Sequence, residues 1–245
     1  MKAPLGRRVT AEAIGTGLLV AVVVGSGIQA TALSRDAGVQ LLANSLATVF
    51  GLGVLITLLG PVSGAHFNPA VTLAAWFTGR RAPDGLTLRD VAAYVPAQIA
   101  GAIGGAILAD AMFAKRLVAF STHDRSAGHV WMGEVVATAG LILLIFGLDR
   151  IGRASLAPAA VASYIGAAYW FTSSTSFANP AVTIGRAFTD TFAGIAPASV
   201  TPFITAQLLG AALGLGIVAA VYGTTATPAR PEAGVPHSAP EPASF

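Results

Sequence analysis

The sequence predicts an all-α membrane protein whose two halves follow one plan in opposite orientations. Three observations lead to this fold class: a membrane-like composition, six apolar stretches and one loop that occurs twice. Of the 245 residues, 54% are hydrophobic and only 10% are charged, and the mean hydropathy is +0.72. Soluble domains carry about 25% charged residues. The chain is therefore expected to lie in a bilayer.

Six stretches are long and apolar enough to cross a bilayer, which takes about 20 residues of helix. In chain order they cover 9–31, 40–59, 91–109, 131–148, 154–171 and 200–222. The first stretch is too long for a cleavable signal peptide, so it is expected to remain as a span. The chain has no cysteine, which excludes disulfides and thiolate metal sites.

Two copies of one loop lie between the predicted spans. Both contain Asn-Pro-Ala-Val-Thr, at 68–72 and at 179–183. Asparagine is a preferred N-cap residue, and proline is tolerated at the first helical position. Each copy therefore predicts a helix that starts within the membrane, and the apolar runs at 71–77 and 182–188 are too short to span it. Because such backbone is tolerated only where it is buried or lines a wet cavity, the pair predicts a pore.

The two halves also match outside these loops. Glu12 in the first span corresponds to Glu134 in the fourth, and Gln98 in the third corresponds to Gln207 in the sixth. Each half has three spans, an odd number, so the second half enters the membrane in the opposite orientation. This arrangement is an inverted repeat, in which broken helices meet at the midplane.

The predicted domain organisation is a single transmembrane domain. It covers 1–222, with one repeat at about 8–110 and the other at about 130–222. The tail at 223–245 holds five prolines and few apolar residues, and is expected to be disordered. Glycines spaced four apart at 101 and 105, and again at 210 and 214, predict close contacts between helices.

The basic residues indicate an orientation and a location. With both termini in the cytoplasm, the inside segments hold nine Lys and Arg residues and the outside segments hold five. The positive-inside rule favours this arrangement. Arg outnumbers Lys by 12 to 2 in an Ala-rich chain, which is typical of a GC-rich bacterial genome, so a bacterial cytoplasmic membrane is expected. The net charge of +3 is small and forms no basic stripe, so nucleic acid is not an expected partner.

On its doubled Asn-Pro-Ala loop and inverted repeat, over about residues 8–222, the chain is identified as a member of the aquaporin, or major intrinsic protein, family. The resemblance implies six tilted spans, two re-entrant half-helices, and a narrow pore in each subunit of a homotetramer. It also implies passive flux of water or small neutral solutes, with no enzymatic activity and no cofactor. Residues 169–197 further resemble a bacterial subgroup linked to arsenic resistance, whose members pass metalloids or methylated arsenicals.

The resemblance assigns the centre of the pore to the two motifs Asn68, Pro69, Ala70 and Asn179, Pro180, Ala181. The asparagine amides would donate to a passing oxygen, while the half-helix dipoles repel cations and protons. Glu12 and Glu134 are ionisable groups within spans. In the family they hold the re-entrant loops by accepting hydrogen bonds; a proton relay is the alternative. His66 is expected to anchor the loop or line the pore, and no metal site is expected.

The outer selectivity filter departs from the family pattern. Most water and glycerol channels of the family carry Arg three residues after the second Asn, but this chain has Val182, which offers no donor. Arg186 lies one turn farther, about 6 Å along a helix. It is interpreted either as a helix-end residue bound to carbonyls or as an outer-vestibule residue. Counting along the chain gives the other filter positions: Thr48 (alternatively Phe50), Ala167 (alternatively Gly166) and Ser176.

The predicted function is a passive channel for small neutral solutes, with a widened filter of Thr48, Ala167, Ser176 and Val182. The first alternative is an ordinary water or glycerol facilitator whose filter Arg186 completes. A second is an ion-coupled secondary transporter, because inverted repeats serve those proteins too. Only Glu12 and Glu134 are ionisable within the spans, which favours the channel, and no motif supports a membrane enzyme.

Overall fold

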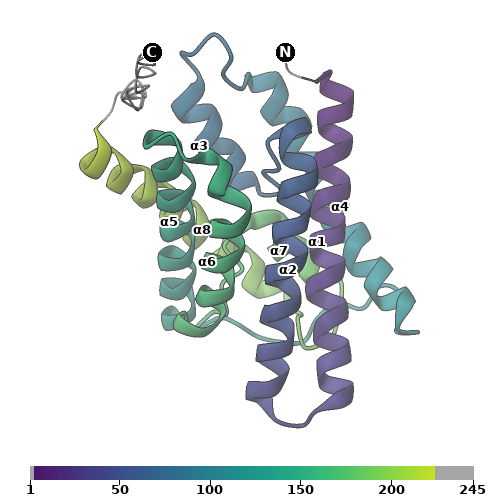
Figure 1. The fold of residues 1–245 in the computed structure, drawn as a ribbon. Helices are drawn as coiled ribbons and strands as arrows, with labels where there is room; N and C mark the ends of the chain where they lie inside the picture. Colours follow the sequence, from purple (N-terminus) through teal and green to yellow (C-terminus); the bar gives the residue numbers. More distant parts are fainter. Residues whose placement is uncertain (1–2, 224–245) are drawn as a thin grey trace, which may run out of the picture.

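The computed structural model describes residues 3–223 (Figure 1). Every secondary-structure element in this range is a helix, and the range contains no strand. The elements are α1 (Leu5–Leu33), α2 (Ala37–Ser63), α3 (Pro69–Gly79), α4 (Leu88–Met112), α5 (Gly128–Arg150), the 3₁₀ turn η1 (Ala154–Leu156), α6 (Ala157–Phe171), α7 (Pro180–Arg186) and α8 (Pro197–Tyr222). The all-α prediction is confirmed. The tail predicted to be disordered lies outside the described residues, except for Gly223.

Within the described part of the chain, five helices are long and apolar enough to cross a membrane: α1, α2, α4, α5 and α8. The fifth stretch expected from the sequence, 154–171, is divided between η1 and α6, and α6 has 15 residues. Proline in the first turn of α6 and extended backbone at Thr172 set its limits. α6 therefore occupies the place of a span but is shorter than the others.

Each re-entrant loop leads into one short helix, α3 or α7. The side chain of Asn68 caps α3 by accepting from the N–H of Ala70 at 2.9 Å. Asn179 caps α7 in the same way, accepting from the N–H of Ala181 at 3.0 Å. Both helices have proline at their first position, where no N–H is needed. The local chemistry of the motif therefore starts a helix at each copy.

The packing of the helices repeats between the two halves. α1 packs chiefly against α4, and α5 packs chiefly against α8, while α2 with α6 and α4 with α7 join the halves. The start of α1 and the end of α8 lie at one end of the molecule, at the top of Figure 1, which we call the terminal end. The opposite end, the loop end, carries the turn at 34–36 and the segment 113–127.

Glycines allow the close approach of the paired helices. A Cβ added to Gly101 or Gly105 of α4 would collide with backbone carbonyl groups of Ala13 and Gly17 in α1. In the second half, a Cβ on Gly214 of α8 would lie 2.6 Å from the carbonyl oxygen of Ala139 in α5. The glycine spacings in the sequence thus mark the two main helix interfaces, as expected for small residues in membrane helices.

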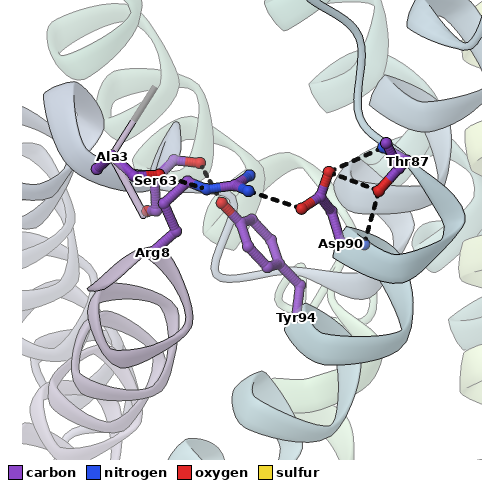
Figure 2. Close-up of polar contacts among 6 residues, drawn as sticks. All are labelled: Ala3, Arg8, Ser63, Thr87, Asp90 and Tyr94. Atoms are coloured by element: carbon purple, nitrogen blue, oxygen red, sulfur yellow. Dashed lines mark hydrogen bonds and ion pairs between the residues drawn. The ribbon is translucent and has the colours of Figure 1, made fainter. Parts of the chain in front are cut away.

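A polar cluster ties α1 to α4 at the terminal end (Figure 2). Arg8 donates to Asp90 Oδ1 at 2.7 Å, and Asp90 also forms a capping box with Thr87 at the start of α4. On the next turn of α4, Tyr94 donates its hydroxyl to the carbonyl oxygen of Ser63 at 2.9 Å. Because Ser63 is the last residue of α2, this cluster fixes the point from which the first re-entrant loop enters.

Candidate functional site

A cavity of about 700 Å³ runs between the two halves of the molecule. Thr78, Asp149 and Ser155 line it towards the terminal end, and Asn68 and Asn179 line its middle. Much of the remaining wall consists of aliphatic side chains of α1, α2, α5 and α6, among them Leu19, Val23, Leu52, Ile56, Leu141, Ile145, Val161 and Ile165. A mostly apolar passage with few polar groups suits small uncharged molecules.

The two asparagines of the repeated motif meet in the middle of this cavity. Asn68 Nδ2 donates to the carbonyl oxygen of Ala178, and Asn179 Nδ2 donates to that of Phe67, both at 2.8 Å. Each amide oxygen caps its own half-helix. An amide nitrogen carries two hydrogens, so each asparagine keeps one donor that can face the cavity.

Both re-entrant loops contain non-glycine residues with left-handed backbone just before the asparagine. Phe67 and Ala178 have φ of 48°, and Ala65 and Ser176 have φ of 48° and 52°. Such a conformation costs about 1–2 kcal/mol for each residue. The strained backbone must therefore be held by other contacts, and two buried carboxylates supply them.

Glu12 and Glu134 bind the two loops in equivalent ways. Glu12 accepts from the backbone N–H of His66 at 3.0 Å and of Phe67 at 2.7 Å. Glu134 accepts from the N–H of Phe177 and of Ala178, both at 2.8 Å. Both carboxylates are fully buried and neither lines the cavity. Their oxygens are occupied by loop contacts, which favours the loop-anchoring role over a proton relay.

A glutamine completes each anchor. Gln98 donates to Glu12 at 2.7 Å and to Thr72 at 2.9 Å, and Gln207 donates to Glu134 at 2.6 Å and to Thr183 at 2.8 Å. The glutamine amide thus connects the carboxylate that holds the loop to the half-helix that follows the loop. This repetition explains why the glutamate and glutamine positions match between the halves of the sequence.

His66 lies where the first loop meets the cavity. Its Nδ1 lies 3.1 Å from Thr72 Oγ1, and its ring packs edge-on against Tyr94 with centroids 5.7 Å apart. The ring also lines the cavity. Loop anchoring and pore lining were both expected of this residue, and the observed contacts are compatible with both.

Three of the four predicted filter residues line the cavity. Thr48, Ser176 and Val182 are 2%, 4% and 4% exposed and belong to its wall. The hydroxyl of Ser176 has no hydrogen-bond partner in the described residues. Phe50, the alternative to Thr48, is 69% exposed on the outer surface of α2.

The prediction that Ala167 belongs to the filter is wrong. Ala167 is exposed on α6 and does not line the cavity, and the alternative Gly166 faces Val49 of α2 instead. Ile165 and Tyr169 are the cavity-lining residues of this part of α6. Counting from the second asparagine missed them because α6 ends at Phe171 and the following loop does not keep helical register. The spacing of four between Ile165 and Tyr169 marks the buried face of α6.

Tyr169 bonds directly to Thr48 across the α2–α6 interface, with 3.1 Å between the hydroxyl oxygens. Thr48 donates its hydrogen to the carbonyl oxygen of Asn44 at 2.9 Å. Because a hydroxyl carries one hydrogen, the bond from Thr48 to Asn44 assigns Tyr169 as the donor in the pair. The phenolic oxygen of Tyr169 is therefore left as an acceptor.

Arg186 lies at the loop end of the cavity, at the last position of α7. It is only 4% exposed, its Nε donates to the carbonyl oxygen of Ala193, and its guanidinium carbon lies 3.4 Å from the centroid of the Phe177 ring. The side chain both binds a carbonyl and faces the cavity, so the two interpretations from the sequence are not exclusive. Phe177 was not among the expected residues, although it directly follows Ser176.

The chain matches the family model described as "Major intrinsic protein" over residues 1–178. It is 52% identical over 214 residues to the aquaglyceroporin AqpS of Rhizobium meliloti, covering 87% of this chain and 89% of that protein. It is 31% identical to the glycerol uptake facilitator protein of Pseudomonas aeruginosa, covering 91% and 92% of the two chains.

A solved structure supports the same fold. The X-ray structure of the aquaglyceroporin from Plasmodium falciparum superimposes with a TM-score of 0.66 at 21% sequence identity, covering 89% of this chain and 97% of that one. At this identity the similarity concerns the arrangement of helices and half-helices alone.

Proposed function

Because the chain belongs to the major intrinsic protein family, and is therefore a membrane channel for water and glycerol-like solutes and not an enzyme, we propose that it is a passive channel with a widened filter. The filter consists of Thr48, Ser176, Val182 and the newly identified Tyr169. The observation that carries this proposal is that Val182 is buried in the cavity wall at the position where the family pattern has arginine. An apolar side chain there leaves more room and removes a fixed cation from this position.

The solutes that fit such a filter are small and uncharged and can include apolar groups. Val182 and Ile165 offer methyl groups, while the Asn68 and Asn179 amides offer donors and Tyr169 offers an acceptor. We extend the proposal to neutral metalloid hydroxides and protonated methylated arsenicals, which combine hydroxyl groups with methyl groups. The resemblance of residues 169–197 to an arsenic-linked subgroup supports this extension.

A second candidate is an ordinary water or glycerol facilitator in which Arg186 takes the place of the usual arginine. The observation in its favour is that Arg186 lines the cavity. Its Nε and the face of its guanidinium are already engaged by Ala193 and Phe177, one turn beyond Val182. These contacts favour a role at the mouth over one beside Val182.

Ion-coupled transport is less compatible with the cavity. The buried carboxylates of the described chain are Glu12, Asp90, Asp110 and Glu134, and none of them belongs to the cavity lining. The acidic residue that does line it, Asp149, is exposed near the terminal end. A coupling ion would need ionisable or carbonyl ligands arranged around the passage.

The proposed setting is the cytoplasmic membrane of a bacterium, with both termini in the cytoplasm and the loop end outside. The excess of basic residues at the terminal end supports this orientation. A homotetramer with one pore in each subunit is proposed from the family resemblance. Native mass spectrometry in detergent tests it, because four copies are expected and a stable monomer would contradict the proposal.

Stopped-flow measurements on proteoliposomes test the function. Water, glycerol, urea, arsenite and methylated arsenicals are offered in turn, with and without proton and sodium gradients. A passive channel gives flux that is linear in the solute gradient and independent of both ion gradients. Saturable flux that requires one of the ion gradients would instead assign the protein to the secondary transporters.

A further inference from the structure

Two arginines at the loop end of the cavity share one aromatic ring. The guanidinium carbons of Arg186 and Arg125 lie 3.4 Å and 5.0 Å from the centroid of the Phe177 ring. Arg186 Nε donates to the carbonyl oxygen of Ala193, and Arg125 Nε donates to that of Gly194 at 3.2 Å. Consecutive carbonyls therefore orient both guanidinium groups around Phe177.

These contacts leave the outer edges of both guanidinium groups without partners. The hydrogen bonds from the two side chains within residues 3–223 use Nε alone, so the four terminal nitrogens have no acceptor there. Arg186 is only 4% exposed, and it lines the cavity. A guanidinium presents its terminal N–H groups in a fork that matches the oxygens of a carboxylate or a similar oxyanion.

Neither arginine forms a salt bridge within residues 3–223, although the buried carboxylate of Glu134 acts on the charges of both from a greater distance. The one salt bridge of the described chain joins Arg8 to Asp90 at the opposite end. Asp124 accepts from Ser126 and Ser199, and Asp190 accepts from Thr122, so both loop carboxylates have contacts of their own. Burying an unpaired cation is costly, and an anion that binds it relieves that cost.

The loop histidine beside this pair responds to the same charges. Partial burial and then the positive charges of Arg125 and Arg186 lower the pKa of His123, although Asp190 and Asp124 act in the opposite direction. The charges of both arginines therefore reach the loop that carries His123.

We propose that Arg125 and Arg186 form a binding site for a small, singly charged oxyanion at the loop-end mouth of the cavity. Arg186 holds the anion from the cavity wall, Arg125 holds it from the segment 113–127, and Phe177 fixes the spacing between them. One turn deeper the wall becomes apolar at Val182, so the anion is retained at the mouth and does not pass. A bound anion narrows the entrance and slows neutral solutes. This effect on flux rests on the proposed channel function, but binding itself does not.

Binding can be measured without flux by using a tryptophan close to the site. Trp131 packs against the apolar cluster that contains Phe177 and Phe203. The chain has three tryptophans, so the double variant Trp76→Phe, Trp170→Phe leaves Trp131 as the one fluorescent indole. This background protein is titrated in detergent with sodium formate, and separately with singly charged methylphosphonate, against sodium chloride at equal ionic strength.

The proposal expects a saturable change in Trp131 fluorescence with an oxyanion and none with chloride. In the same background, Arg125→Gln and Arg186→Gln should each weaken binding about tenfold, because each removes a charge-assisted donor pair. Arg125 is the partly buried member, so its variant gives an answer even if Arg186→Gln does not fold. The matched control is Arg116→Gln, which removes an exposed arginine from the same segment and should leave the affinity unchanged.

The outcomes separate the site from the function. No saturable change, or equal affinity in the background protein and in Arg125→Gln, overturns the anion site. Saturable binding that also slows glycerol entry from the loop-end side in proteoliposomes supports both the site and the channel. Saturable binding in a protein that passes neither water nor glycerol supports the site and overturns the proposed function.

Discussion

Asn68 and Asn179 are joined crosswise, because the amide of each donates to the backbone carbonyl that precedes the other. The two hydrogen bonds, to Ala178 and to Phe67, are both 2.8 Å long. Each asparagine therefore supports the opposite half-helix while its oxygen caps its own. A change at either residue affects both loops together.

Replacing Asn179 by Leu should reduce water and glycerol flux about tenfold or more. The variant loses the cap of α7, worth about 1 kcal/mol, and a donor in the middle of the cavity. Asn179→Asp is the informative companion, because aspartate still caps a helix but cannot donate to Phe67 and adds a negative charge. Its thermal stability should fall less than that of the leucine variant, while its flux stays low. Normal flux through well-folded Asn179→Leu would remove this residue from the pore.

The hydroxyl of Tyr169 is expected to bind polyols as they pass. Tyr169→Phe removes this acceptor, and since a net hydrogen bond is worth about 0.5–1.5 kcal/mol, glycerol flux should fall several-fold relative to water flux. Tyr164→Phe is the matched control on the same helix, because Tyr164 donates to the carbonyl oxygen of Ala137 and does not line the cavity. The ratio of glycerol to water permeability, measured by stopped flow, tests whether the Tyr169 hydroxyl binds polyols. An unchanged ratio in Tyr169→Phe would contradict the role.

Local sequence signals predicted the elements whose structure depends on nearby residues. Asparagine caps α3 and α7, and proline occupies the first position of both helices. The five-residue motif alone was therefore enough to predict where each half-helix begins. The anchoring glutamates were found because a carboxylate within a span needs partners. The same reasoning could not identify Tyr169, since its position depends on how α6 ends and how the following loop returns.

The environment of Arg186 depends on tertiary structure in the same way. The sequence placed it one turn beyond Val182, but its partners come from Phe177, from the carbonyl of Ala193 and from the distant segment that carries Arg125. No periodicity relates these three segments. The pairing of two arginines on one ring therefore became visible only in the folded chain.

Two adjacent glycines of α4 should respond differently to the same substitution. A Cβ at Gly105 would collide with the backbone of Gly17 in α1, whereas one at Gly104 would meet nothing within 4 Å. Gly105→Ala should therefore force α1 and α4 apart and lower the melting temperature strongly. Gly104→Ala should leave it unchanged or raise it slightly, since alanine is favoured over glycine within helices by about 0.5–1 kcal/mol. Similar melting curves for the two variants would contradict the close packing of α1 on α4.

Val182 decides the width of the passage in the proposed filter. It lies in the cavity wall three residues after Asn179, and its backbone N–H donates to the capping oxygen of that residue, with 3.3 Å between nitrogen and oxygen. This hydrogen bond fixes the backbone from which a side chain at position 182 projects. Arg186, one turn farther, is bound to Ala193 and Phe177.

Val182→Arg should slow glycerol and larger solutes much more than water. The arginine adds bulk and a positive charge where the wall is now apolar, and the nearby guanidinium of Arg186 prevents it from turning outward without like-charge repulsion. Val182→Met is the control for size, because it adds length without charge. The ratio of glycerol to water permeability, measured by stopped flow, should be lowest in Val182→Arg, intermediate in Val182→Met and highest in the unmodified chain. If the arginine variant kept the original ratio, the side chain at 182 would not line the narrow part, and the mouth at Arg186 would be the selective region.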